Sequence, residues 1–386
     1  MECTIYLSEE CNLRCSYCYE GDKKRKKIMS SEGLRKSLDF IMANNQGEED
    51  INLTFLGGEP LMNKKKIYEF IDLVEKEYSE ASNNFRYAIT TNGVLLDEKL
   101  IELFKNHSFD VSISIDGDKQ THNLNRVSVD GKDVYGKIIA NMEQLQESGL
   151  YFSVRMTATQ NNIHLLSANV RHFYDMGIKK IHIGVDTVGH WSEEALSELD
   201  YQYEQLDNLY LNRVSESKDL ILNLYDFKLS IFVAARTPKY CSGGTAGHIV
   251  INSQGELFPC GYVVNDSEWN LGQVKSGLDE SKFVNSIKKN VSGKSKCHEC
   301  DIAFTCTGAK CGFYNYFKTG KLNVHSQMTC KLERLLYKHN LYVLKEMYRR
   351  KSARLFYYLE KAEEKSIPLS ETMLQVIIEE KQEEIR

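Results

Sequence analysis

The sequence predicts an α/β protein: a partial (β/α)6 barrel, then a small cysteine-rich domain and C-terminal helices. Three observations indicate this fold. Short apolar, β-branched runs alternate six times with longer amphipathic stretches, which is typical of βα units around a parallel sheet. Near Arg236 glycine and cysteine become frequent and the helical period disappears. Helical periodicity returns toward the C-terminus. We therefore expect domains at residues 1–235, 236–335 and 336–386.

Each predicted barrel strand is followed by a predicted helix. The strands are expected at Thr4–Leu7, Asn52–Leu56, Arg86–Thr91, Asp110–Ile115, Phe152–Thr157 and Lys180–Val185. The helices are expected at Ser31–Asn44, Lys65–Glu80, Asp97–Asn106, Tyr135–Glu147, His164–Met176 and Glu193–Ser217, several of them opened by a capping Ser, Asp or Asn. Six units predict a partial barrel, because the complete barrel of this type has eight.

The remaining elements follow from turn residues and helical spacing. A hairpin is expected with its turn at Ser253–Gly255. Two C-terminal helices are expected at Leu332–Arg349 and Ser370–Arg386, with a break near Pro368.

Composition excludes several classes of protein. Of 386 residues, 42% are hydrophobic and 27% are charged, which is ordinary for a globular chain and excludes general disorder. The net charge of -5 gives no basic field for nucleic acid. No export signal precedes Cys3, and no apolar run approaches the roughly 20 residues that span a bilayer. We expect a cytoplasmic protein without a nucleic-acid or membrane partner.

The eleven cysteines favour metal or cluster binding, because cytosolic thiols are kept reduced. Three of them are Cys11, Cys15 and Cys18, and seven crowd between Cys241 and Cys330. Cys3 is expected to be a small buried residue of the first strand.

The first group of cysteines lies in the loop after strand one, at the barrel end where active sites form. Three thiolates within eight residues can bind three irons of a cubane cluster, which leaves the fourth iron open. Zinc is the alternative. A structural zinc site needs four closed ligands, and no His or fourth Cys lies nearby in sequence, so we favour the cluster.

The segment CNLRCSYC, residues 11–18, resembles the CxxxCxxC motif of the radical S-adenosylmethionine superfamily, including its aromatic residue before the third Cys. The resemblance implies that a 4Fe-4S cluster bound by Cys11, Cys15 and Cys18 presents its fourth iron to S-adenosylmethionine. Cleavage of the cofactor would give a 5'-deoxyadenosyl radical that takes hydrogen from the substrate. An electron donor such as a flavodoxin or ferredoxin would reduce the cluster.

Other segments resemble the cofactor contacts of that family. Gly57-Gly58-Glu59-Pro60 is similar to its GGEP segment, whose backbone meets the amino group of the cofactor, and paired glycines permit such close approach. The further contacts implied are Asn92, Ser114, Asp116 and Arg126, and Arg155 on the fifth strand could pair with the cofactor carboxylate. Turn residues are the alternative for the Asn-Gly and Asp-Gly pairs. Arg155 could instead form a salt bridge inside the barrel, and Asp186 is a candidate substrate contact.

The C-terminal cysteines resemble the SPASM domain, which holds auxiliary clusters in radical enzymes acting on peptides. This resemblance implies one 4Fe-4S cluster on Cys297, Cys300, Cys306 and Cys330, and another on Cys241, Cys260 and Cys311. Four residues separate Cys306 from Cys311 where the family has three. With three thiolates, the second cluster has either an open iron or a water or other residue as its last ligand. A zinc ribbon on Cys297, Cys300, Cys306 and Cys311 is the alternative.

The substrate expected is a ribosomally made, Cys-containing peptide joined by a thioether or related cross-link. Sulfatase-maturing enzymes share the two-part plan, and residues 112–126 resemble theirs, but those enzymes carry an Asp where Gly261 follows Cys260. A non-enzymatic electron carrier or zinc module is the alternative of another class. It would not need GGEP or six βα units.

Recognition of the peptide is not explained by a separate domain, because the first cluster cysteine is already at position 11. A separate recognition protein, the barrel rim or the C-terminal helices could supply it. The basic run 23–27 could attract an acidic leader, or it is a solvated surface loop.

Overall fold

The computed structural model describes residues 1–20, 27–45, 50–186, 189–216, 220–235, 243–244, 247–293 and 295–385. The chain divides into two compact units, which are described separately. Unit 1 comprises Met1–Ile115, His122–Phe152 and Cys241–Val291. Unit 2 comprises Asp116–Thr121, Ser153–Tyr240 and Ser292–Arg386.

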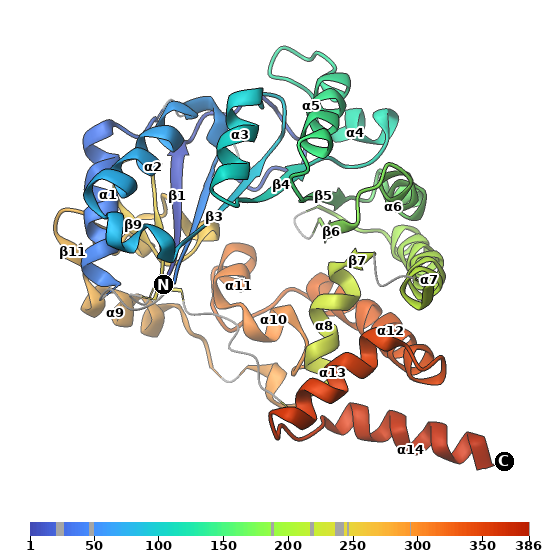
Figure 1. Cartoon of the computed structure of the whole chain (residues 1–386). Coiled ribbons are helices and arrows are strands. Elements are labelled where there is room, and N and C mark those ends of the chain that lie inside the picture. The colour runs from blue at the N-terminus through green and yellow to red at the C-terminus, as the bar shows by residue number, and fades with distance from the viewer. Residues whose placement is uncertain are drawn as a thin grey trace. The chain divides into compact units, whose positions relative to one another are not determined.

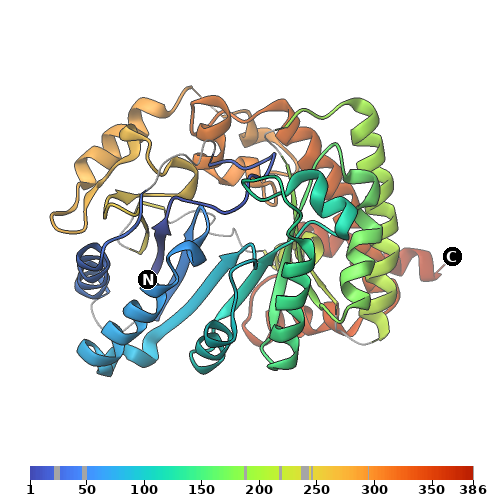
Figure 2. The same ribbon diagram turned by 90° about the horizontal axis from the view of Figure 1, so that it is seen from above.

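Unit 1 contains strands in the order β4-β3-β2-β1-β8-β9. All neighbours are parallel except the hairpin of β8 with β9. In both Figure 1 and Figure 2 the blue helices α1 and α2 lie on one side of the blue strands. The strands are β1 (Glu2–Ser8), β2 (Ile51–Gly57), β3 (Phe85–Thr91), β4 (Asp110–Ser114), β8 (His248–Ile251) and β9 (Leu257–Phe258), with a small ribbon of β10 (Gly272–Gln273) and β11 (Gly277–Leu278).

The helices of unit 1 form where caps and apolar spacing favour them. In α1 (Ser31–Asn44) the Ser30 hydroxyl accepts the Gly33 N–H, and the buried residues recur at helical spacing. Asp97 caps α3 in the same way. Alternating burial along β2 places Phe55 in the core, where its ring stacks with those of Tyr87 and Phe109. The other helices are α2 (Lys65–Glu77), α3 (Glu98–Asn106), α5 (Tyr135–Glu147) and α9 (Glu280–Asn290).

Unit 2 contains the parallel strands β5 (Phe152–Ala158), β6 (Lys180–Val185) and β7 (Ile221–Leu222), followed by the C-terminal helices. Helix α12 packs against α7, α8 and α14, as the red, green and yellow ribbons of Figure 1 show. The helices are α6 (Leu166–Asp175), α7 (Glu193–Glu216), α8 (Asn223–Val233), α10 (Thr307–Lys310), α11 (Gly312–Thr319), α12 (Gln327–Arg349), α13 (Ala353–Glu364) and α14 (Glu371–Ile385).

The predicted alternation of six strands and helices is confirmed, as is the hairpin, whose Gly255 has φ +76°. Cys3 is buried in β1, at 2% exposure. The sequence analysis missed the helices α4 (Lys119–Asn125), α8 to α11 and α13. The structure adds that β8 pairs with β1, so residues 241–291 group with the first four strands. The three-domain division stays a prediction.

No helix among the described ranges combines the length and the apolar character that crossing a membrane requires.

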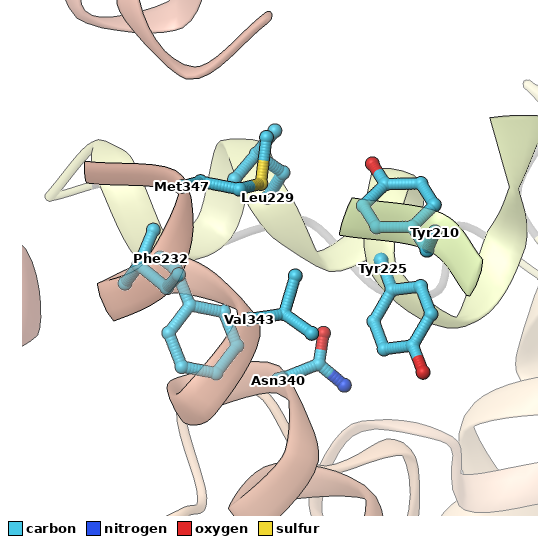
Figure 3. Close-up of a pocket in the computed structure, with 8 residues that line it drawn as sticks. Tyr210, Tyr225, Leu229, Phe232, Asn340, Val343 and Met347 are labelled. Atoms are coloured by element: carbon cyan, nitrogen blue, oxygen red, sulfur yellow. The ribbon is translucent and has the colours of Figure 1, made fainter. Parts of the chain in front are cut away.

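A buried polar network joins three helices of unit 2. Tyr225 of α8 lines a cavity of about 10 Å³, too small for more than one water. Figure 3 shows its hydroxyl pointing away from that of Tyr210. The Tyr225 hydroxyl donates a hydrogen bond to the Asp207 carboxylate of α7 at 2.6 Å. The other oxygen of Asp207 lies 2.6 Å from Nδ1 of His339, and Nε2 of His339 lies 2.8 Å from Asp200. The His339 side chain therefore links α12 to α7.

This network predicts a pH-dependent stability. Burial opposes the charge on His339, but hydrogen bonds and the negative charges of Asp207 and Asp200 outweigh it and raise its pKa. Because the folded pKa lies above the unfolded value, the stabilisation is complete below about pH 6.5 and is lost as pH rises through the folded pKa. We expect His339→Gln to lower the free energy of unfolding by about 2 kcal/mol below pH 6.5 and to flatten the pH profile.

Anaerobic urea unfolding followed by circular dichroism at several pH values measures this effect. His248→Gln is the control, because its side chain is 30% exposed beside Glu2. If the free energy of unfolding of His339→Gln changed with pH in parallel with that of the unsubstituted protein, the charged imidazole would not be the cause of the pH dependence.

Candidate functional site

The loop after β1 carries Cys11, Cys15 and Cys18, and a second segment of unit 1 fixes its path. The backbone N–H of Arg14 donates to Val127 at 2.8 Å, and that of Ser16 donates to Asn125 at 3.0 Å. The Arg126 guanidinium lies 5.3 Å from the centre of the Tyr17 ring. Residues 125–127 thus clamp the cysteine loop, and Arg126 contacts the motif itself.

Gly57 and Gly58 bring the end of β2 against the same loop. The N–H of Gly58 donates to the Ser8 carbonyl at 2.9 Å, and the N–H of Glu59 donates to the Glu10 carbonyl at 2.8 Å. A Cβ atom at Gly58 would lie 2.4 Å from the oxygen of Glu10, and one at Gly57 would lie 2.1 Å from that of Ser8. Only glycine permits this backbone contact.

The Glu59 carboxylate ties the ends of β2 and β3 together. It is 2% exposed and accepts hydrogen bonds from the Thr91 hydroxyl at 2.6 Å, the Asn92 N–H at 2.8 Å and the Leu61 N–H at 3.0 Å. Pro60 opens the short 3-10 helix Pro60–Asn63 that follows. The carboxylate therefore has a structural role, and it orients the backbone beside the cysteines.

Asn92 reaches the cysteine loop directly. Its side-chain amide donates to the Asn12 side chain at 2.8 Å, and the same nitrogen lies 3.9 Å from the Cys11 sulfur. Ser114 ends β4 in the same unit and is half-buried. Unit 1 thus brings together the three cysteines, Gly57–Pro60, Asn92 and Arg126.

Three further predicted residues belong to unit 2. Asp116 is 1% exposed and accepts the Thr157 N–H at 3.0 Å, so its carboxylate holds the end of β5. Arg155 lies on β5 with an exposed side chain. The Asp186 carboxylate accepts the Gly189 N–H at 3.2 Å.

A tyrosine cluster in unit 1 was missed by the sequence analysis. The rings of Tyr19 and Tyr262 lie 5.7 Å apart, and a Cβ atom at Gly261 would lie 3.2 Å from the Tyr6 hydroxyl. Burial raises the pKa of Tyr6 well above its usual value, with smaller contributions from Tyr19 and Glu20, so its hydroxyl stays neutral. Tyr19 directly follows Cys18, and Tyr262 lies two residues after Cys260, a proximity that could have suggested the cluster.

The C-terminal cysteines of unit 2 lie in or next to helices, and Cys330 lies near the start of the long helix α12. Cys297 lies in the 3-10 helix Lys296–Glu299, which ends at Cys300, and Cys306 and Cys311 directly precede α10 and α11. Burial raises the pKa of Cys330, and the charges of Cys297 and Cys300 raise it further, so these three sulfurs lie in one neighbourhood. Burial also raises the pKa of Cys306, to about 11. Cys260 follows β9 in unit 1, and Cys241 lies outside the described residues.

Among the described cysteines, neither group forms a site for a single ion. Within the described part of the chain, no three His, Cys, Asp or Glu side chains converge on a point that could hold one metal ion. A cubane cluster instead takes one thiolate at each of several irons, so its ligands stand apart. A loop of three thiols, clamped on one side and backed by glycine on the other, fits such a cluster.

Comparison with known proteins agrees with this geometry. Residues 5–166 match the family model described as the Radical SAM superfamily. A cysteine-type anaerobic sulfatase-maturating enzyme of Clostridium novyi (strain NT) is 28% identical over 313 residues, which cover 76% of this chain and 83% of that protein.

Solved structures show the shared fold. The structure of anSMEcpe with bound AdoMet has a TM-score of 0.75 at 19% identity, covering 93% of this chain and 98% of that one. SuiB of Streptococcus suis bound to the precursor peptide SuiA has a TM-score of 0.59 at 15% identity, covering 85% of this chain and 75% of that one. The solved structures share the fold, and the family match places a Radical SAM superfamily domain at residues 5–166, so the chain is an enzyme that uses S-adenosylmethionine and a 4Fe-4S cluster.

Proposed function

We propose that this enzyme is a peptide maturase that installs a thioether or related cross-link in a Cys-containing peptide. When bound, the cluster and S-adenosylmethionine supply a 5'-deoxyadenosyl radical, which removes a hydrogen atom from the substrate. The fold of the chain resembles that of SuiB bound to the precursor peptide SuiA and that of anSMEcpe bound to the Cp18Cys peptide. These two likenesses support a peptide as the substrate class.

The residues proposed to hold the cofactors follow from the contacts in unit 1. Cys11, Cys15 and Cys18 would bind the radical cluster, and the backbone of Gly57–Pro60 would meet the amino group of S-adenosylmethionine. Asn92 positions the Cys11 side of the loop, and Arg126 positions Tyr17. Ser114, Asp116 and Arg155 are proposed as further cofactor contacts. The auxiliary clusters are assigned to Cys297, Cys300, Cys306 and Cys330, and to Cys241, Cys260 and Cys311.

Gly261 is the observation on which the choice of reaction rests. At the position after Cys260, where sulfatase-maturing enzymes carry an Asp, this chain has no side chain to accept a proton. The nearest polar group to a Cβ atom there is the hydroxyl of Tyr6, whose raised pKa makes it a poor base at neutral pH. Gly261 and Tyr6 thus favour a reaction that does not use a carboxylate at the position directly after Cys260.

Formylglycine formation in a sulfatase is the second candidate. It is favoured by the identity with the Clostridium novyi enzyme over most of both chains. It requires a base from elsewhere in the site.

Cross-link formation conserves atoms and electrons. One C–H and one S–H bond of the peptide break, and one C–S bond forms. A hydrogen atom goes to the 5'-deoxyadenosyl radical, the thiol proton goes to solvent, and one electron is left for an acceptor of the iron-sulfur class. A flavodoxin or ferredoxin is proposed as the external reductant, and a separate protein could present the peptide.

The test is an anaerobic reaction of the reconstituted enzyme with S-adenosylmethionine and dithionite. A Cys-containing peptide encoded beside this gene is expected to lose two hydrogens per link, and its Cys→Ser form is expected to give no such product. Mass spectrometry and hydrazide trapping of aldehydes measure the outcome. An aldehyde on a sulfatase peptide, with the neighbouring peptide unchanged, would select the second candidate.

A further inference from the structure

Two nitrogen donors from outside the predicted ligand set lie against cysteine sulfurs of unit 2. Nδ1 of His325 is 3.4 Å from the Cys297 sulfur, and Nε2 is 3.7 Å from it. Nη2 of Arg334 is 3.5 Å from the Cys300 sulfur. The Arg334 nitrogen donates to the Cys300 sulfur, and either His325 ring nitrogen can donate to a Cys297 thiolate in the tautomer that carries the proton there. Two of the four proposed ligands therefore each have a nitrogen donor group beside them.

The position of Arg334 is fixed by its neighbour in the ligand loop. Its guanidinium donates to both oxygens of Asp301, at 2.9 and 3.3 Å, in the forked geometry that arginine forms with a carboxylate. Asp301 directly follows Cys300, and Arg334 lies one helical turn after Cys330 on α12. The guanidinium therefore spans from one proposed ligand segment to the other.

The position of His325 is fixed by the start of α12. The next residue, Ser326, caps the helix by accepting the Thr329 N–H at 3.1 Å. On the other side, a Cβ atom at Gly308 would lie 3.7 Å from Cβ of His325 and 2.9 Å from the Thr329 side chain. The backbone at His325 thus lies between the cap of α12 and the short helix α10, which directly follows Cys306.

We propose that His325 and Arg334 donate hydrogen bonds to the Cys297 and Cys300 thiolates and thereby raise the reduction potential of the cluster on Cys297, Cys300, Cys306 and Cys330. Reduction adds negative charge to the cluster and its sulfurs, so N–H donors stabilise the reduced state more than the oxidised one. Asp301 also lies 3.6 Å from the Cys300 sulfur and pairs with Arg334, so the effect of Arg334 is assigned to its N–H donor and not to its net charge. The inference rests on the proposed function, which assigns these cysteines to a cluster.

A raised potential gives this cluster a chemical role in the proposed reaction. Cross-link formation leaves one electron after the hydrogen atom and the thiol proton have departed. A cluster that is easier to reduce is the better acceptor for that electron. His325 and Arg334 are therefore positioning residues for the redox step, not ligands to iron.

The test measures potential and cluster content separately in the full chain. In a background in which Cys11, Cys15 and Cys18 are alanine, EPR-monitored redox titration follows the auxiliary clusters alone, and Cys297→Ala identifies the signal of this one. We expect His325→Leu and Arg334→Met each to shift its midpoint potential to a more negative value. The equilibrium constant for one-electron reduction should fall about tenfold, which is about 59 mV for one electron.

Matched variants separate this effect from a change in folding or surface charge. His325→Asn keeps an N–H donor near the Nδ1 position and should restore most of the potential. Arg350→Met removes the arginine at the C-cap of α12, which pairs with Glu346, and should leave the potential unchanged.

Unshifted potentials in both His325→Leu and Arg334→Met, with full iron and sulfide content, would overturn the inference. Strong ¹⁴N coupling to the cluster in ENDOR spectra, lost in His325→Leu, would also overturn it by making the histidine a ligand. If Cys297→Ala removes no iron or EPR signal, the ligand assignment itself fails, which is a result distinct from an unshifted potential.

Discussion

Replacing Cys15 with alanine is expected to abolish formation of 5'-deoxyadenosine. Cys15 lies at the centre of the loop clamped by residues 125–127. Without its thiolate, Cys11 and Cys18 can bind only two of the irons, and the third iron has no protein ligand. We expect at least a thousandfold loss of S-adenosylmethionine cleavage, with the same loss in Cys11→Ala and Cys18→Ala. Chromatography of the reaction after dithionite reduction measures the product.

Cys3→Ala is the matched control for this series. Cys3 lies in β1, close in sequence to the cluster cysteines but outside their loop. Its side chain is buried, and this burial raises the pKa of its thiol. Losing one buried sulfur costs about 1 kcal/mol of stability and should leave cleavage intact. Cleavage that survives in Cys15→Ala at the level of Cys3→Ala would remove Cys15 from the cluster.

Gly58→Ala is expected to have the second largest effect, through the backbone of the cysteine loop. Its new Cβ atom would lie 2.4 Å from the Glu10 oxygen and 2.7 Å from the Glu9 oxygen, and backbone atoms cannot move aside as a flexible side chain would. The loop must shift next to Cys11. We expect a loss of about 3 kcal/mol in stability, together with reduced iron content and weaker binding of S-adenosylmethionine.

Gly136→Ala provides the comparison within the same unit. Gly136 lies in the first turn of α5, and a Cβ atom there would meet nothing within 4 Å. Alanine favours the helix by at most about 1 kcal/mol, so iron content and cofactor binding should not change. Thermal unfolding and isothermal titration with S-adenosylmethionine compare the two variants. Equal stability and equal affinity for S-adenosylmethionine in the two variants would mean that the close backbone contact at Gly58 is not needed for folding or cofactor binding.

The sequence was most informative where a local pattern determines a local structure. Alternating burial in β2 and capped helical spacing in α1 and α3 are short-range signals, and these elements formed as predicted. The glycines of the GGEP segment were predicted to let the backbone approach the cofactor, and that contact stays a prediction. The structure shows that they also let the backbone approach the Ser8 and Glu10 carbonyls.

Features that depend on distant partners could not be read from the sequence. Helix α8 is apolar on most sides because it lies among other helices, so its amphipathic signal is weak. The pairing of Asp207 with His339 joins residues more than a hundred positions apart, and nothing local to either one identifies the other. The role of Glu59 was also hidden, because its partners Thr91 and Asn92 come from the following strand.

The pairing of β1 with β8 determines which truncated forms of the chain leave a strand edge exposed. Glu2 to Ile5 are aligned with His248 to Ile251, so one edge of the first strand stays open until nearly two thirds of the polypeptide has left the ribosome. A fragment ending near residue 235 would expose a row of unpaired amides and carbonyls beside apolar side chains, which is a template for association with other chains. Such a fragment should precipitate on expression, whereas a chain extended to residue 291 would close that edge with its own hairpin.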